Sequence, residues 1–161
     1  MDDPKQRMQQ AAVRMSGLIE DLLQFSRVLG DSRPFQTVDL GVLAHEVLSD
    51  LERAAHAAGA KVEIGPLPTL EALPFQMRQL FQNLIANAIK FRRSGEPLVL
   101  TILARPGQNG YTEVEFTDNG IGFEEQYAEK IFQPFLKLHS RAEYEGTGLG
   151  LAICRRILLR H

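Results

Sequence analysis

At 161 residues the chain is long enough for one globular domain, or for one domain with a short appendage. Apolar residues make up 44% of the sequence and charged residues 24%, values that argue against wholesale disorder and against a membrane-embedded class. The 18 basic and 20 acidic side chains give a net charge of −2, so the composition predicts no nucleic-acid partner and no anionic-membrane surface.

The single cysteine and the start of the chain bear on its location. Cys154 excludes an internal disulfide and is expected to be buried filler in an apolar helix. No apolar run approaches the roughly 18 residues of a membrane-spanning helix, and the first residues do not form a signal peptide. The chain is therefore expected in the cytoplasm, with any membrane anchor belonging to a larger parent protein.

The first predicted element is a helix from Gln6 to Leu29. Apolar residues recur there at spacings of three, four and seven, and further apolar residues widen the stripe. Members of the stripe are Met8, Ala11, Ala12, Met15, Leu18, Ile19, Leu22, Phe25 and Leu29. A wide stripe predicts a helix packed within a bundle of several helices. Gly30 and Pro34 end the helix, which places a boundary between one domain at residues 1–32 and a second at residues 33–161.

Strand and helix signals alternate between residues 35 and 93. The sequence FQTVDL predicts an extended stretch whose Asp39 caps a helix from Gly41 to Ala57. The predicted inward residues of that helix are Val42, Leu43, Val47, Leu48 and Leu51. KVEIG and TLEAL predict one clear strand and one weaker strand. A helix from Pro74 to Arg93 follows, and its apolar face consists of Met77, Phe81, Leu84 and Ala88.

An antiparallel pair of strands is expected after residue 97. LVLTILARPG and YTEVEFTDNG alternate apolar and polar residues on either side of GQNG, which predicts a hairpin in the centre of a sheet. A short helix from Glu125 to Phe132 is expected next. The polar stretch from Gln133 to Glu145 shows little periodicity and predicts a mobile loop. The last predicted element is a helix from Gly148 to Leu159.

Three polar side chains share one stripe of the helix that begins at Pro74. Asn83, Asn87 and Lys90 stand at i, i+4 and i+7, so they project from the same side. Asparagine suits a helix interior poorly, and two amide oxygens can ligate Mg²⁺ while the lysine faces a phosphate. A solvated polar face explains the same three residues equally well.

Two glycine-rich segments have candidate roles of their own. Asp118 to Gly122 reads DNGIG, which is ordinary turn chemistry, and a turn is the preferred interpretation of this segment taken alone. Its functional interpretation is a buried carboxylate that accepts a hydrogen bond from an amino group, with glycines that admit a flat ligand such as adenine. Gly146 to Leu151 leads into a helix, whose N-terminus attracts anions. Leu151 in place of a third glycine excludes a dinucleotide fingerprint, and the lack of Gly-Lys-Ser/Thr excludes a Walker loop.

Together, and in this order, these segments resemble the motif boxes of sensor histidine kinases. NLIANAIKF at 83–91 resembles the N box, DNGIG at 118–122 the G1 box, FQPF at 132–135 the F box and GTGLGL at 146–151 the G2 box. Residues 14–26 resemble the second helix of the family's dimerisation domain. The segments 90–92 and 131–146 are similar to the phytochrome-like and hybrid branch of this GHKL superfamily.

The resemblance implies an α+β fold, the two-layer α/β sandwich called the Bergerat ATP-binding fold. A mixed sheet forms one layer and helices form the other, and a long N-terminal helix precedes them. Family members continue beyond the equivalent of His161 with a terminal hairpin, so the terminal strands are expected to be missing here. An exposed sheet edge and an N-terminal helix without its mate predict self-association or marginal stability.

The resemblance also implies roles for residues of the boxes. Asp118 hydrogen-bonds the adenine amino group of ATP. Asn83 and Asn87 coordinate Mg²⁺ and, with Lys90 on the phosphates, form the catalytic set. Further nucleotide contacts are expected from Gly120, Ile121, Gly122, Phe132, Lys137, Gly146, Thr147, Gly148, Leu149 and Gly150. The lid runs from Gln133 to Glu145. Three of its residues are candidates to contact the γ-phosphate: Lys137, His139 and Arg141. Charged side chains that are simply solvated in a loop are at least as good an interpretation of these three.

Members of the family transfer the γ-phosphoryl group of ATP to a histidine on the first dimerisation helix, and from there to an aspartate of a response regulator. The acceptor helix is expected upstream of Met1, and His45, beside Glu46, fits an ordinary helix histidine. The fragment is therefore expected to bind ATP without completing phosphotransfer. Expected partners are the receiver domain of a response regulator, the acceptor helix of the same kinase, and a second copy of the chain through the N-terminal helix.

Two other functions compete with a kinase. ATP hydrolases of the wider superfamily, such as gyrase, mismatch-repair and heat-shock ATPases, place a glutamate where Asn83 stands, because activating water requires a general base. Asparagine favours phosphoryl transfer instead, unless Gln82 or Glu143 supplies a base. The second alternative is a regulatory module that binds nucleotide or a partner protein without chemistry.

Overall fold

The computed structural model describes residues 3–139 and 144–161. By their contacts the residues form two compact units: a sheet unit, Arg33–Gly122, and a helical unit, Met1–Ser32 together with Phe123–His161. One division falls just after the N-terminal helix. The other follows the DNGIG segment and has no signal in the sequence.

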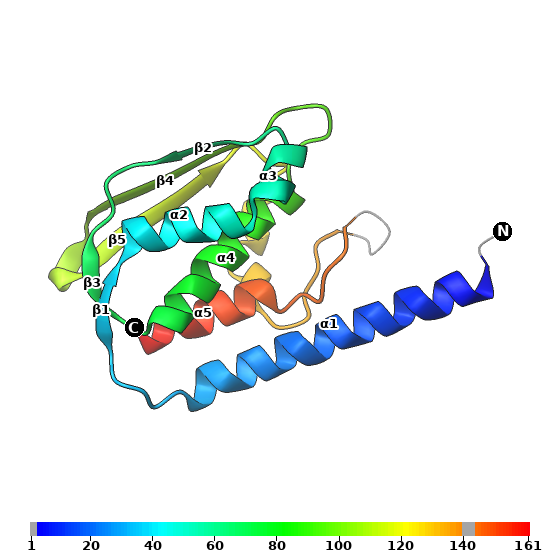
Figure 1. The fold of residues 1–161 in the computed structure, drawn as a ribbon, viewed down its shortest axis with the longest axis horizontal. Helices are drawn as coiled ribbons and strands as arrows, with labels where there is room; N and C mark the ends of the chain where they lie inside the picture. The colour runs from blue at the N-terminus through cyan, green and yellow to red at the C-terminus, as the bar shows by residue number, and fades with distance from the viewer. Residues whose placement is uncertain (1–2, 140–143) are drawn as a thin grey trace. The chain divides into compact units, whose positions relative to one another are not determined.

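The sheet unit contains five strands in two sheets (Figure 1). Strand β1 (Gln36–Asp39) pairs antiparallel with β3 (Thr69–Ala72). Strand β2 (Lys61–Ile64) runs parallel to β4 (Val99–Pro106), which pairs antiparallel with β5 (Thr112–Asp118). The order β2-β4-β5 makes the larger sheet mixed. The predicted antiparallel pair is confirmed, but only β4 is central, because among the described strands β5 has a neighbour on one side alone.

Three helices accompany these strands: α2 (Leu40–Asp50), α3 (Glu52–Ala57) and α4 (Pro74–Lys90). Asp39 caps α2 as predicted, since its carboxylate accepts a hydrogen bond from the Val42 N–H at 3.0 Å. The single helix expected over this region is interrupted at Leu51, whose φ of −97° and ψ of 8° leave the helical range. Two shorter helices therefore replace the predicted one.

The buried face of α2 agrees with the prediction at Leu43 and Val47, whereas Leu48 and Leu51 are only half-buried. Val42, expected to point inward, is 56% exposed. The buried residues of the helix are instead Leu40, Leu43, Ala44 and Val47. These stand at i, i+3, i+4 and i+7, the spacing of one helical face, and Val42 lies off that face.

Helices α2 and α4 lie over one face of the larger sheet, which makes the sheet unit a two-layer α/β sandwich (Figure 1). Leu98, just before β4, and Leu100 and Ile102, in its first half, are buried. Phe81 of α4 meets Phe116 of β5 edge to face, with ring centroids 5.1 Å apart. Apolar contact between the layers therefore fixes the position of α4, and with it the polar stripe that the helix carries.

The helical unit contains α1 (Pro4–Gly30) and α5 (Gly150–Arg160), which pack against each other (Figure 1). The guanidinium carbon of Arg156 lies 5.9 Å from the centre of the Phe25 ring, within cation–π range. Cys154 of α5 is a free cysteine with 1% of its surface exposed. The prediction that this thiol is buried filler in an apolar helix is confirmed.

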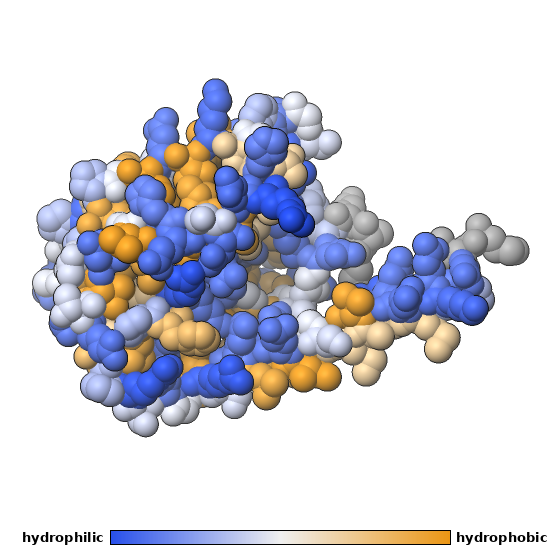
Figure 2. All heavy atoms as spheres, in the orientation of Figure 1, coloured by the Kyte–Doolittle hydropathy of each residue, from blue (hydrophilic) through white to orange (hydrophobic). Residues whose placement is uncertain are grey.

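Most of α1 is exposed. Among its described residues only Val28 is buried, and Figure 2 shows hydrophobic residues along the lower side of this helix. The exposed large apolar side chains of α1 are Met8, Val13, Met15, Ile19, Leu22, Leu23 and Leu29. The predicted bundle stripe is therefore largely uncovered. None of the helices in the two described ranges combines the length and the apolarity needed to cross a membrane.

The segment that joins the sheet unit to α5 contains two separate 3-10 turns, Glu125–Tyr127 and Lys130–Phe132, where one short helix was expected. In the first turn the Tyr127 N–H bonds the Glu124 carbonyl at 2.9 Å and the Ala128 N–H bonds the Glu125 carbonyl at 3.0 Å. In the second turn the Gln133 N–H bonds the Lys130 carbonyl at 2.9 Å. These bonds reach back three residues, the 3-10 pattern, which is used in short pieces.

Candidate functional site

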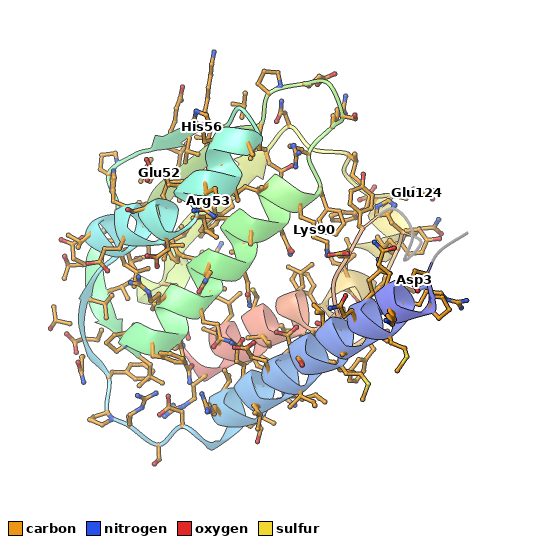
Figure 3. The ribbon with its side chains drawn as sticks, turned by 45° about the vertical axis from the view of Figure 1, so that its right-hand side comes forward. Asp3, Glu52, Arg53, His56, Lys90 and Glu124 are labelled. Carbon is orange, nitrogen blue, oxygen red and sulfur yellow. The ribbon has the colours of Figure 1, made fainter. Side chains whose placement is uncertain are left out.

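The polar stripe of α4 lies in its last two turns. Asn83, Asn87 and Lys90 are half-buried, whereas the neighbouring Gln82 is exposed. The Lys90 ammonium lies 4.7 Å from the centre of the Phe91 ring, and Figure 3 shows Lys90 at the C-terminal end of the helix. The three side chains are thus neither core residues nor a fully solvated face, which is compatible with contact to a ligand.

The loop from Asp118 to Gly122 is held by its own side chains. The Asp118 carboxylate accepts a hydrogen bond from the Gly120 N–H at 2.7 Å, through Oδ1. The Asn119 side chain accepts from the Val99 N–H at 2.8 Å and donates to the Pro97 carbonyl at 3.1 Å. The loop is therefore anchored to the start of β4, and the orientation of the carboxylate is set locally.

Asp118 does not match the expectation of a buried carboxylate. Its side chain is exposed, because it ends the edge strand β5, where the described sheet has no further neighbour. Within the described residues the Gly120 N–H is the one hydrogen-bond donor to this carboxylate, so Oδ2 remains available to an amino group. Because the fold leaves the Asp118 carboxylate exposed, only a bound ligand would bury it.

The end of α4 and this loop are joined directly. The Phe91 carbonyl accepts a hydrogen bond from the Ile121 N–H at 2.9 Å, and Arg93 Nε donates to the Gly120 carbonyl at 3.1 Å. A β-carbon at Gly120 would lie 2.6 Å from Asp118 Oδ1 and 2.7 Å from the Phe91 carbonyl oxygen. Such distances leave no room for a side chain, so this position requires glycine. The sheet unit thus brings the ends of the N box and the G1 box together.

The second glycine-rich segment belongs to the helical unit. The Gly148 carbonyl accepts a hydrogen bond from the Phe135 N–H at 3.0 Å, and Lys137 Nζ donates to the Gly146 carbonyl. Gly148 has a φ of +80°, and a β-carbon there would lie 3.0 Å from the backbone of Phe135. The segment is therefore folded back on residues 135–137, which contribute the end of the F box and the start of the lid.

Thr147 joins this segment to α1. Its hydroxyl donates to the Asp21 carboxylate and accepts from the Leu149 N–H at 3.3 Å. Helix α5 begins at Gly150, where a β-carbon would meet nothing within 4 Å. The first turn of a helix offers N–H groups that have no partner within the helix, so the segment has the local form of an anion site.

Comparison with known proteins places the chain in a family. The sequence model for histidine kinase-, DNA gyrase B- and HSP90-like ATPases matches residues 72–161, more than half of the chain. The chain belongs to this family. Cyanobacterial phytochrome A of Nostoc sp. (strain PCC 7120 / SAG 25.82 / UTEX 2576) is 41% identical over 147 residues, which cover 91% of this domain and 19% of the phytochrome.

Solved structures confirm the predicted fold of this ATPase-family domain. Full-length ShkA in complex with AMPPNP superimposes with a TM-score of 0.71 at 28% identity, covering 98% of this chain and 34% of that one. The nucleotide-free catalytic domain of histidine kinase ThkA gives a TM-score of 0.64 at 28% identity, covering 80% of this chain and 82% of that one. The domain therefore resembles catalytic domains of sensor histidine kinases, and it spans about a fifth of the phytochrome relative.

The remaining candidates lie in and around the lid of the domain. Phe132 is half-buried at the end of a 3-10 turn. The His139 and Tyr144 rings are 5.4 Å apart. Lys137 is exposed, and its ammonium donates to the Gly146 carbonyl. Arg141, a candidate for the γ-phosphate, and Glu143, a candidate hidden base, lie outside the described residues.

Sequence reasoning missed three residues that anchor candidate segments within their own units: Asn119 and Arg93 in the sheet unit, and Asp21 in the helical unit. The role of Asn119 could have been predicted from the sequence, because the side chain of an asparagine before glycine often hydrogen-bonds nearby backbone groups. Arg93 is 27 residues from Gly120 and Asp21 is 126 residues from Thr147. No local pattern encodes partners at those separations.

Proposed function

We propose that this domain binds Mg²⁺-ATP and is the catalytic domain of a sensor histidine kinase. The observation that carries the proposal is the assembly at the end of α4, where an oriented Asp118 carboxylate stands beside a glycine that admits no side chain. Such a group accepts a hydrogen bond from the amino group of adenine while the bare backbone admits the ring. Family membership and the likeness to ShkA with AMPPNP support the same ligand.

The polar stripe of α4 suits the phosphates and their metal. Asn83 and Asn87 offer neutral amide oxygens from adjacent turns of one helix face, a donor set that fits a hard cation without adding negative charge. Bound there, Mg²⁺ would neutralise charge on the phosphates. Lys90 adds a positive charge at the helix end, and the backbone of Gly146, Gly148 and Gly150 receives the phosphates.

In this proposal the γ-phosphoryl group passes to a histidine on an acceptor helix of the parent kinase, and then to the receiver domain of a response regulator. Transfer to a neutral imidazole needs mainly positioning and charge neutralisation, which the amides and the lysine supply. The exposed apolar face of α1 supports a homodimer through that helix. We place the domain in the cytoplasm, where ATP and response regulators are found.

A thermal-shift titration with ATP and Mg²⁺ tests the proposal. Ligand at about 100 times its dissociation constant should add about 2.7 kcal/mol to the free energy of unfolding. Asp118→Asn should lose most of this gain, because an amide oxygen is a weaker acceptor than a carboxylate. Glu115→Gln removes the same charge from the same strand and should respond to ATP as the wild type does. A wild type that saturating ATP leaves unchanged contradicts the proposal.

A further inference from the structure

Two consecutive arginines follow α4 and use their guanidinium groups differently. Arg92 donates to the Ile89 carbonyl in the last turn of α4 at 2.9 Å. Arg93 donates through Nε to the Gly120 carbonyl at 3.1 Å, in the loop that carries Asp118. Both hydrogen bonds are partly buried. The resemblance to histidine kinases assigned no role to Arg93.

With the hydrogen bond from Arg93, both polar groups of the Gly120–Ile121 peptide have a partner. The Gly120 carbonyl and the Ile121 N–H belong to the same peptide plane; Arg93 holds its oxygen and the Phe91 carbonyl holds its N–H, at 3.1 Å and 2.9 Å. Rotation of this plane would break both bonds at once. Glycine permits such rotation easily, since it lacks the β-carbon that restricts other residues.

The hydrogen bonds that hold the Gly120–Ile121 peptide also help to orient the Asp118 carboxylate. The Gly120 N–H donates to Asp118 Oδ1 at 2.7 Å, so its direction depends on the backbone of Gly120 being held in place. A hydrogen bond from a charged donor to a carbonyl is stronger than one from a neutral donor, which suits Arg93 to this task. An oriented loop meets a ligand without first losing conformational freedom.

We propose that Arg93 is a positioning residue that locks the Gly120–Ile121 peptide and thereby makes the Asp118 carboxylate selective for an adenine base. The inference rests on the proposed function and adds a source of base selectivity. Adenine offers an amino group to the carboxylate, whereas guanine offers a carbonyl oxygen at the same ring position, which a carboxylate repels. A loosened loop loses this discrimination but keeps the groups that bind phosphate.

Paired variants of the whole chain test the inference. Arg93→Met keeps the aliphatic stem and removes the donor, and Arg92→Met is the matched control. Calorimetry with Mg²⁺ and ATP, GTP or inorganic triphosphate should show ATP binding weakened about tenfold in Arg93→Met, with GTP and triphosphate binding unchanged. The ratio of ATP to GTP affinity should therefore fall about tenfold. Arg92→Met should match the wild type, and Arg93→Lys should lie between.

Hydrogen exchange of the chain without nucleotide gives a second readout. The Gly120 and Ile121 amides should exchange faster in Arg93→Met than in the wild type, while Arg92→Met leaves them unchanged. If Arg93→Met does not fold, Arg93→Lys replaces it, with Arg92→Lys as its control. The ratio of ATP to GTP affinity should then fall by less than tenfold in Arg93→Lys and stay unchanged in Arg92→Lys.

Two results would overturn the inference: an unchanged ratio of ATP to GTP affinity, or equal weakening of ATP, GTP and triphosphate, which a merely structural role predicts. A wild type that binds none of the three would overturn the proposed function instead. The exchange of Gly120 and Ile121 would still show whether Arg93 holds the loop, so the two failures are distinguishable.

Discussion

Two glycines of one segment differ in what the fold demands of them. Gly148 has a φ of +80°, and a β-carbon there would press against the backbone of Phe135 and Leu136 at 3.0–3.1 Å. Gly150 opens α5, has no positive φ, and has open space where a side chain would begin. The fold therefore explains glycine at position 148 but gives no reason for it at position 150. A phosphate that approaches the backbone would give one.

Alanine substitution separates these roles. Gly148→Ala should lower the free energy of unfolding by about 1–3 kcal/mol, through strain and crowding. Gly150→Ala should leave it unchanged within about 0.5 kcal/mol, since alanine suits a helix start at least as well as glycine. Its ATP affinity should nevertheless fall about tenfold, because a methyl group would stand where the phosphates approach. Urea unfolding and ATP titration measure the two effects, and normal ATP binding by Gly150→Ala would remove this residue from the phosphate site.

At the scale of elements, the exposed apolar face of α1 and the proposed homodimer give a second prediction. Ile19→Glu places a charge in the middle of that face and should weaken self-association at least tenfold, since burying the charge would cost more than burying the isoleucine gains. Val42→Glu is the matched control, because both side chains are 56% exposed but Val42 stands on α2. Sedimentation equilibrium measures the effect. Equal association of the two variants would mean that α1 is not the interface.

Arg78 of α4 forms ion pairs with Glu46 and Asp50 of α2, and this charge clamp between the two helices gives a third prediction. The Arg78 guanidinium bonds Glu46 at 2.8 Å and Asp50 at 2.6 Å. The groups are one-third to one-half exposed, so solvent screens them, and Arg78→Met should cost only about 0.5–1 kcal/mol of unfolding free energy. Chemical denaturation at low and high salt measures this loss, which should shrink at about 1 M salt. A loss that salt does not change would indicate packing of the arginine stem instead.

The pH dependence of the clamp follows from the pKa of Arg78. Hydrogen bonds to Asp50 and then to Glu46 raise the pKa of this guanidinium above its usual value. A raised pKa in the folded state stabilises the fold at every pH below the unfolded value, and the effect is lost only as the pH rises through the folded value. The guanidinium contribution should therefore stay constant between about pH 6 and pH 9, the range in which arginine remains charged. A difference between wild type and Arg78→Met that varies across this range would contradict the assignment.

At the scale of the whole molecule, the reaction separates a kinase from a hydrolase. The chain should release phosphate from ATP no faster than buffer does, because neither Asn83 nor Asn87 can act as a general base. With a separately supplied acceptor helix of a parent kinase it should form acid-labile phosphohistidine. Asn87→Ala should abolish that product if Asn87 holds the metal. Phosphate release without an acceptor would favour the hydrolase and point to a carboxylate such as Glu143 as the base.

The sequence alone determined the local features of this domain. The long helix at the start, the Asp39 cap, the strand pair and the family boxes all follow from residue spacing within a few turns or strand steps, because the forces that set them act between near neighbours in the chain. The burial of the free Cys154 was also predicted correctly, because the apolar helix that contains it has to pack one side against a core. The order and spacing of the motif boxes also indicated the likeness to histidine-kinase catalytic domains without any tertiary contact.

Only the tertiary structure decided the rest. It interrupted the second predicted helix at Leu51, turned Val42 outward, and left Asp118 exposed at the end of an edge strand. It also joined Arg93 to Gly120, a contact between segments far apart in the chain. These features depend on which surfaces meet when the chain closes on itself, and a local pattern carries no information about a partner that arrives from a distant part of the sequence.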